Sequence, residues 1–164
     1  MSRHFMGENR VSRFHDEKGN FVDIVGLPYA IPAFFSAMAK RLLSIRPRVP
    51  MISYRARHEI ENLLTPDTRM IEFGSGNSTL WFAARVGYLF SIEDLPDWYE
   101  HVQQELQSTG VDNVQHELRS VEKYADLSFI DDRSIDFALV DGSDREGCII
   151  ALLPKIKSGG WLYL

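Results

Sequence analysis

The pattern of hydrophobic and polar positions changes near residue 65 of this 164-residue chain. Before that point two segments have apolar residues at helical spacing, one over Ile31–Ser44 and one over "YRARHEIENLL", which Ser53 caps. After it, short apolar runs alternate with helical ones, which is typical of strands paired in parallel through helices. The pattern predicts an N-terminal extension with two helices over residues 1–64 and an α/β domain over residues 65–164.

The α/β part should contain five strands and three helices. The expected strands are Met70–Phe73, Tyr88–Ile92, Val114–Glu117, Ile135–Val140 and Trp161–Leu164, and the expected helices are Thr79–Val86, Pro96–Ser108 and Glu146–Ile156. In the second of these helices Trp98, Val102 and Leu106 are spaced by four, so we expect Trp98 to be a core residue. Ligand chemistry in such a sheet belongs at the carboxyl ends of its strands.

One such end carries the stretch "IEFGSGNST", in which Gly74 and Gly76 permit a tight turn between a strand and a helix. A dinucleotide or S-adenosylmethionine would fit a turn of this kind. The dinucleotide motif needs a third glycine where this chain has Thr79. A carboxylate at Glu72 would repel a pyrophosphate but suits an amine, and Glu93 could accept hydrogen bonds from a ribose. The pair of acids favours S-adenosylmethionine, although NAD enzymes also use an acid at the position of Glu93.

Three stretches, "MIEFGSGNST", "LFSIEDLPDWYEHV" and "IDFALVDGSDREGCIIALLPKIKSGGWLYL", carry a family resemblance over Met70–Leu164. In their sequence and order they resemble class I S-adenosylmethionine-dependent methyltransferases, in particular small-molecule and sugar O-methyltransferases. The resemblance implies a Rossmann-like parallel sheet of order 3-2-1-4-5 flanked by helices. It also implies S-adenosylmethionine as cofactor and a small-molecule or sugar-type acceptor, most simply methylated on oxygen.

The resemblance also implies a set of cofactor-binding residues, each matched to a family motif. The methionyl side would be held by Glu72, Gly74, Ser75 and Gly76, with the Ser78 hydroxyl on the cofactor carboxylate. The nucleoside would be held by Glu93 at the ribose, Asp94 and Leu95 beside the adenine, and Arg119 and Ser120 at its edge. Asp141 would face the methyl donor and the acceptor, as a general base or as one metal ligand.

Charge and composition narrow the range of partners. The net charge is −5, with ten basic and four acidic residues over 1–57 but eight and nineteen over 58–164. An acidic main domain argues against nucleic-acid binding, which needs a basic face. The five histidines have no zinc-ligand spacing, so no zinc site is predicted and no set of metal ligands is assigned. Cys148 is the single cysteine, which excludes an intrachain disulfide and suggests the cytoplasm, and no apolar stretch is long enough to span a bilayer.

The chain ends where the family would continue with two closing strands and a last helix, so the domain is expected to be incomplete at its C-terminus. Its last strand would then be an unpaired apolar edge, which makes a homo-oligomer plausible. Two other functions stay open at this point. One is an NAD-dependent oxidoreductase on the same architecture, and the other is a non-catalytic module that binds the cofactor or a partner.

Overall fold

The structure is a computed structural model that describes residue 50 and residues 52–164. These residues fall into two compact units, one containing Ile52–Glu59 and the other containing residue 50 and Ile60–Leu164. The expected helix over Ile31–Ser44 lies outside the described residues. The second predicted helix is confirmed as α2 (Tyr54–Leu63), and the Ser53 hydroxyl accepts a hydrogen bond of 3.1 Å from the backbone N–H of Ala56.

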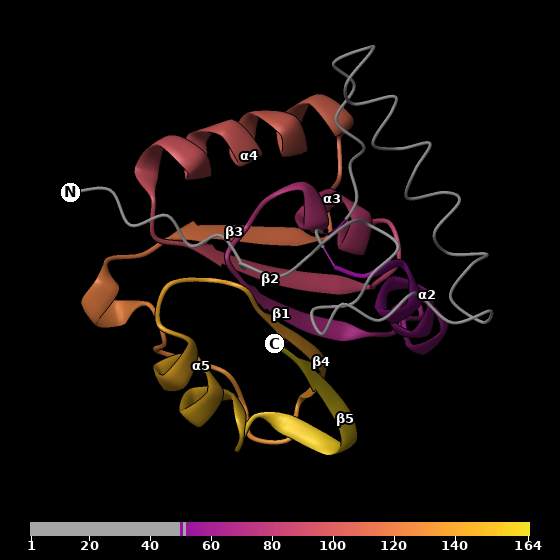
Figure 1. The fold of residues 1–164 in the computed structure, drawn as a ribbon. Helices are drawn as coiled ribbons and strands as arrows, with labels where there is room; N and C mark the ends of the chain where they lie inside the picture. The colour runs from indigo at the N-terminus through magenta and orange to yellow at the C-terminus, as the bar shows by residue number, and fades with distance from the viewer. Residues whose placement is uncertain (1–49, 51) are drawn as a thin grey trace, which may run out of the picture. The chain divides into compact units, whose positions relative to one another are not determined.

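The larger unit is built on a sheet of five parallel strands in the order β3-β2-β1-β4-β5 (Figure 1). This confirms the predicted fold class and strand order. The central strand β1 is buried on both faces from its second residue onward, as an apolar run in a covered parallel sheet requires. The strands are β1 (Arg69–Phe73), β2 (Tyr88–Glu93), β3 (Val114–Leu118), β4 (Ile135–Val140) and β5 (Ile156–Tyr163).

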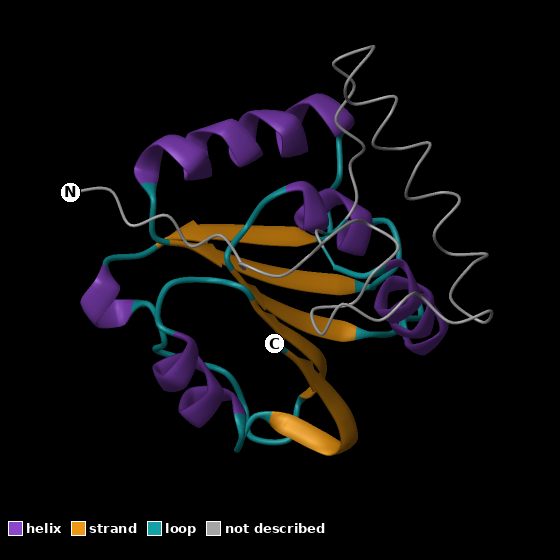
Figure 2. Ribbon diagram, in the orientation of Figure 1, coloured by secondary structure: helices purple, strands orange, loops and turns teal. Residues whose placement is uncertain are grey.

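Helices cover both faces of this sheet (Figure 2). On one face lie α3 (Asn77–Ala83) and α4 (Pro96–Thr109), which share a small cluster of Leu80, Val102 and Leu106. On the other face lies α5 (Arg145–Leu152), whose Cys148 and Leu152 are fully buried in the main core. A single turn of 3-10 helix, η1 (Val121–Lys123), follows β3. All five strands therefore direct their carboxyl ends to the same edge, at the left of Figure 1.

The structure corrects the predicted bounds of three elements, α3, α5 and β5. The first helix after the glycine turn begins at Asn77 and not at Thr79. The Thr79 hydroxyl accepts a hydrogen bond of 2.9 Å from the backbone N–H of Gly76, and this cap stabilises a first helical turn that starts at Asn77. The last helix ends at Leu152, and the last strand begins at Ile156 and not at Trp161. The glycine-containing segment between Ile156 and Trp161 belongs to β5, and the pairing of β5 with β4 is irregular there.

Candidate functional site

The carboxyl ends of three strands converge on the turn from Gly74 to Gly76. The backbone N–H of Gly74 donates to the Ile92 carbonyl of β2 at 2.9 Å, and the N–H of Asp141 donates to the Phe73 carbonyl at 2.8 Å. Gly74 has a φ of 91°, and a Cβ there would lie 2.9 Å from the backbone of Asp141. Only glycine fits both the backbone conformation and the space at this position.

Glu72 lies beneath the turn with none of its surface exposed. Its carboxylate accepts three hydroxyl hydrogen bonds, from Ser78 at 2.5 Å, Thr79 at 2.7 Å and Ser91 at 2.7 Å. Burial raises the pKa of Glu72 to about 7, although the three hydroxyls favour the ionised form. The predicted partner of the cofactor amine is therefore a buried acid that titrates near neutral pH. The Ser78 hydroxyl, predicted to bind the cofactor carboxylate, is directed at this acid.

Glu93 joins the glycine turn to the end of β2. One carboxylate oxygen accepts the N–H and the hydroxyl of Ser75 at 3.0 and 2.9 Å, and the other accepts the N–H groups of Asp94 and Leu95 at 3.1 and 3.0 Å. The side chain is only 3% exposed. The structure thus brings Glu72, Glu93 and the turn together at the carboxyl edge of the sheet.

Trp98 was expected from its helical spacing to be a core residue, and this prediction is wrong. Its side chain is 37% exposed, whereas Val102 and Leu106 on the same helix face are buried. The indole N–H donates to the Ser75 carbonyl at 2.6 Å, and a Cβ at Gly76 would lie 3.7 Å from the ring. Because Trp98 is in the first turn of α4, it lies beside the glycine turn and outside the packed core. Helical spacing alone does not show whether a residue on this face lies in the core or beside the glycine turn.

The loop after β4 carries the predicted catalytic acid. Asp141 is exposed, and its carboxylate accepts a hydrogen bond of 2.8 Å from the Arg145 guanidinium, itself exposed. Two residues further on, the Ser143 hydroxyl donates to the Asp94 carboxylate at 2.6 Å. This bond connects the loops that follow β2 and β4, the strands on either side of β1. Leu95, predicted beside the adenine, is 60% exposed.

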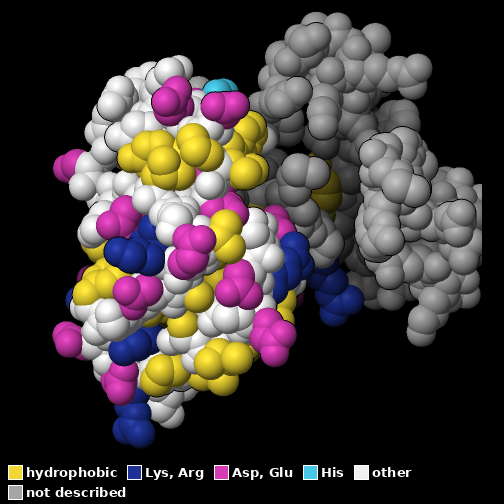
Figure 3. Space-filling model, turned by 90° about the vertical axis from the view of Figure 1, so that its left-hand side faces the viewer, with side chains coloured by type: hydrophobic (Ala, Val, Ile, Leu, Met, Phe, Trp, Pro, Cys, Tyr) yellow, Lys and Arg dark blue, Asp and Glu magenta, His cyan; other side chains and the backbone are white. Residues whose placement is uncertain are grey.

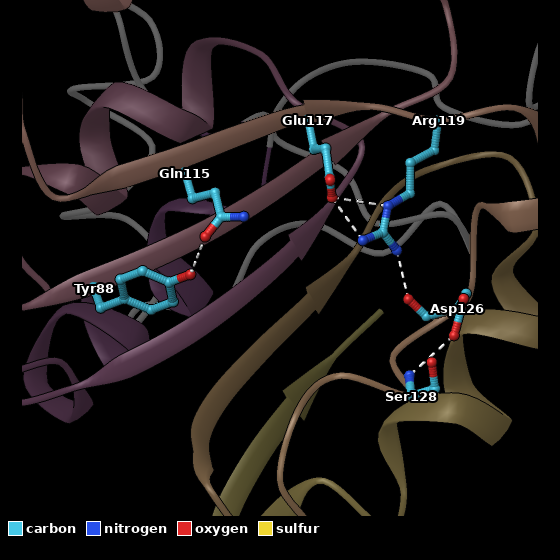
Figure 4. Close-up of polar contacts among 6 residues, drawn as sticks. All are labelled: Tyr88, Gln115, Glu117, Arg119, Asp126 and Ser128. Atoms are coloured by element: carbon cyan, nitrogen blue, oxygen red, sulfur yellow. Dashed lines mark hydrogen bonds and ion pairs between the residues drawn. The ribbon is translucent and has the colours of Figure 1, made fainter.

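Arg119 and Ser120 follow β3 at the same edge, but the Arg119 side chain is engaged within the protein (Figure 4). Its guanidinium donates two hydrogen bonds to the Glu117 carboxylate at 2.9 and 2.6 Å and one to the Asp126 carbonyl at 2.5 Å. The side chain is 11% exposed. Its backbone N–H bonds the Glu93 carbonyl at 2.8 Å, so the backbone reaches the site while the side chain holds the loop after β3.

Two further features concern ligands outside the predicted set. A hollow of about 480 Å³ lies between the end of α4 and the start of β3, away from the carboxyl ends of the strands. Among residue 50 and residues 52–164, no group of three His, Cys, Asp or Glu side chains could hold a metal ion, and no helix is long and apolar enough to cross a membrane. Figure 3 faces the carboxyl edge, where basic side chains are separated by acidic and apolar ones.

Comparisons with known proteins show the fold and leave the sequence without a close match. No family model matches the chain, and no curated protein matches it in sequence. Among solved structures, a putative caffeoyl-CoA O-methyltransferase from Staphylococcus aureus is similar with a TM-score of 0.61 and 16% identity, over 84% of this chain and 71% of that one. The fold is thus the Rossmann-like fold of class I S-adenosylmethionine-dependent methyltransferases.

Two other similar structures are described by different activities. Precorrin 8W decarboxylase from Methanobacterium thermoautotrophicum has a TM-score of 0.55 and 27% identity, over 70% of this chain and 64% of that one. Phosphoethanolamine N-methyltransferase 1 from Haemonchus contortus, in complex with phosphoethanolamine and S-adenosylhomocysteine, has a TM-score of 0.51 and 15% identity, over 81% and 26%. The chain spans less than two thirds of each of these two proteins, and the three similar structures differ in the activities by which they are named.

Proposed function

We propose that this chain binds S-adenosylmethionine at the carboxyl edge of the sheet and transfers its methyl group to a hydroxyl of a small-molecule or sugar-type acceptor. The observation that carries the proposal is the pair of buried carboxylates, Glu72 and Glu93, on either side of the Gly74–Gly76 turn. Acids at these two places suit the amine and the ribose hydroxyls of that cofactor, and would repel a pyrophosphate. The fold supports the same class of ligand.

The residues of the site fit the group in their chemistry. Glu93 is held at the end of β2 by four hydrogen bonds, which fill the acceptor sites of its carboxylate, so a ribose hydroxyl would replace one of these bonds. When bound, the cofactor supplies a methyl group on a sulfonium with a neutral leaving group. The protein then has to align the acceptor and to remove its proton. We assign the removal of that proton to Asp141, because its exposed ion pair with Arg145 is weak enough for an acceptor to replace.

A non-catalytic module is the second candidate. The observation that favours it is that Glu72, Glu93 and Asp141 all have partners within the chain. Self-association through β5, the last strand in the sheet order, would suit such a module as well as an enzyme. For either function we propose a cytoplasmic location, because the one cysteine, Cys148, is a buried free thiol.

Titration calorimetry with S-adenosylmethionine, S-adenosylhomocysteine and NAD tests the proposal. We expect micromolar binding of the first two, no binding of NAD, and binding about tenfold or more weaker in Glu93→Gln, because the amide has one acceptor oxygen fewer for the ribose. Glu100→Gln, which changes an exposed glutamate of α4, is the matched control and should bind as the wild type does. Tight binding of NAD by the folded protein would replace methyl transfer with the oxidoreductase alternative.

A further inference from the structure

Tyr124 is a buried residue at the carboxyl edge that the predicted site does not include. It directly follows η1 and is 1% exposed, with its ring centroid 5.4 Å from that of Phe73. Its hydroxyl points at the backbone of Gly142 in the loop after β4, where a Cβ would overlap it. Glycine at position 142 therefore leaves the space that the tyrosine hydroxyl occupies. The phenol thus lies directly below the loop that carries Asp141.

The hydroxyl of Tyr124 has no hydrogen-bond partner. Within the described part of the chain, only this atom and His116 Nε2 are buried side-chain polar atoms without one. The backbone of Ser143 is close enough to favour the ionised phenol but makes no well-formed hydrogen bond with it. A buried hydroxyl without a partner costs free energy, and buried polar groups in native proteins are nearly always satisfied. A partner that is absent from the free chain would remove this cost.

The surroundings of the hydroxyl define the chemistry of that partner. Burial, together with the nearby Asp94, Cys148 and Glu93, raises the pKa of Tyr124 far above its ordinary value, so the phenol stays protonated and acts as a donor. The carboxylates of Asp94 and Glu93 also disfavour an anionic acceptor such as a carboxylate or phosphate. An uncharged acceptor, such as a ring nitrogen of a heterocyclic base, is compatible with them.

We propose that the Tyr124 hydroxyl donates a hydrogen bond to a ring nitrogen of the adenine of the bound cofactor. The inference rests on the proposed function and adds to it a base-recognising residue on the face of the sheet that α5 covers. The loop after β4 encloses the hydroxyl, and the hydrogen bond between Ser143 and Asp94 connects this loop to the end of β2. Access to the hydroxyl therefore requires that exposed hydrogen bond to open when the ligand binds.

The test compares Tyr124→Phe with the wild type in titrations with S-adenosylhomocysteine and its 1-deaza, 3-deaza and 7-deaza analogues. We expect Tyr124→Phe to bind S-adenosylhomocysteine about three- to tenfold more weakly, as the loss of one hydrogen bond would. One deaza analogue should bind more weakly than the parent to the wild type but equally to Tyr124→Phe. Tyr88→Phe is the matched control, since the Tyr88 hydroxyl donates to Gln115 at the other end of β2.

A denaturation midpoint in urea completes the test. Tyr124→Phe should unfold at the same or a higher urea concentration than the wild type, because it removes a hydroxyl without a partner. A lower midpoint would show that the hydroxyl is bonded in the free protein and would overturn the inference. If Tyr124→Phe and the wild type bind S-adenosylhomocysteine with equal affinity, the role of Tyr124 is overturned but the proposed function is not. If the folded wild type does not bind S-adenosylhomocysteine, the proposed function is overturned as well.

Discussion

At the scale of single residues, Glu72 makes the stability of the protein depend on pH. Its pKa is raised from 4.5 to about 7 in the folded chain, so the folded state holds a proton that the unfolded state has lost between these values. The stabilising contribution of the protonated acid is complete below pH 4.5 and is lost as the pH rises through 7. At 1.36 kcal/mol for each pKa unit, the loss is about 3 kcal/mol.

Glu72→Gln should remove this dependence. We expect the free energy of unfolding of the variant, relative to the wild type, to rise by about 3 kcal/mol from pH 4.5 to pH 7.5, measured by urea denaturation at several pH values. The difference between the two proteins is the informative quantity, because His116 acts in the opposite sense. Burial lowers the pKa of His116 to about 4, which makes the protein more stable as the pH rises from 4 to 6.5. A constant difference would contradict the prediction.

Gly74 shows how one backbone position determines the shape of the site. Gly74→Ala would place a Cβ against the backbone of Asp141 in a chain segment with positive φ, and we expect a loss of about 2–4 kcal/mol in the free energy of unfolding. Gly110→Ala is the control, because Gly110 also has a positive φ of 68° but no atom within 4 Å of its Cβ position. Its loss should be about 1 kcal/mol. Equal losses would mean that close packing at Gly74 contributes nothing.

At the scale of elements, the connection after β3 depends on Arg119. Its guanidinium bonds Glu117 and the Asp126 carbonyl and lies 5.2 and 5.0 Å from the ring centroids of Phe90 and Phe129. These contacts join a strand to a long irregular segment that has little regular structure of its own. The sequence pattern placed Arg119 at the right edge of the sheet. It could not show that the side chain turns back to the protein, because its partners lie in the following loop.

Arg119→Gln should therefore lower the free energy of unfolding by about 1–3 kcal/mol, measured by urea denaturation. Arg145→Gln, which removes an exposed guanidinium from its ion pair with Asp141, should cost at most about 0.5 kcal/mol. If Arg119→Gln keeps its stability but loses affinity for S-adenosylhomocysteine, the side chain serves the ligand, as the family resemblance implies.

At the scale of the whole molecule, β5 is the last strand in the order of the described sheet and pairs only with β4 there. Trp161 on this strand is 55% exposed, and Leu164 after it is 58% exposed. An exposed edge with apolar side chains is a surface on which another strand can pair. Self-association through this edge is the oligomer that the sequence pattern predicts.

Trp161→Glu should weaken that association, because it places a charge on the edge where two copies would pair. We expect sedimentation velocity to show a wild-type sedimentation coefficient that rises with protein concentration. The sedimentation coefficient of Trp161→Glu should stay at the value of a monomer at all concentrations. Val121→Glu, which changes an apolar residue of η1 with 67% exposure, should behave as the wild type does. A wild type that is monomeric at all concentrations would rule out this assembly.

The sequence by itself determined the order and type of the elements and the place of the acids. Alternating apolar runs predict parallel strands, and in such a sheet Glu72, Glu93 and Asp141 must lie at the same edge because each closes or nearly closes a strand. These conclusions need only local periodicity and the direction of the chain. The boundaries of α3 and β5 were missed because a side-chain cap and an irregular strand decided them.

Only the tertiary structure decided what each side chain does at that edge. The three hydroxyls on Glu72 come from α3 and β2, the carbonyl that Trp98 bonds belongs to Ser75, and the space for the Tyr124 hydroxyl is left by Gly142. Each contact joins residues from different elements, and its direction depends on how those elements pack. Periodicity along the chain carries no information on such directions, because they arise when the helices and loops pack against the sheet.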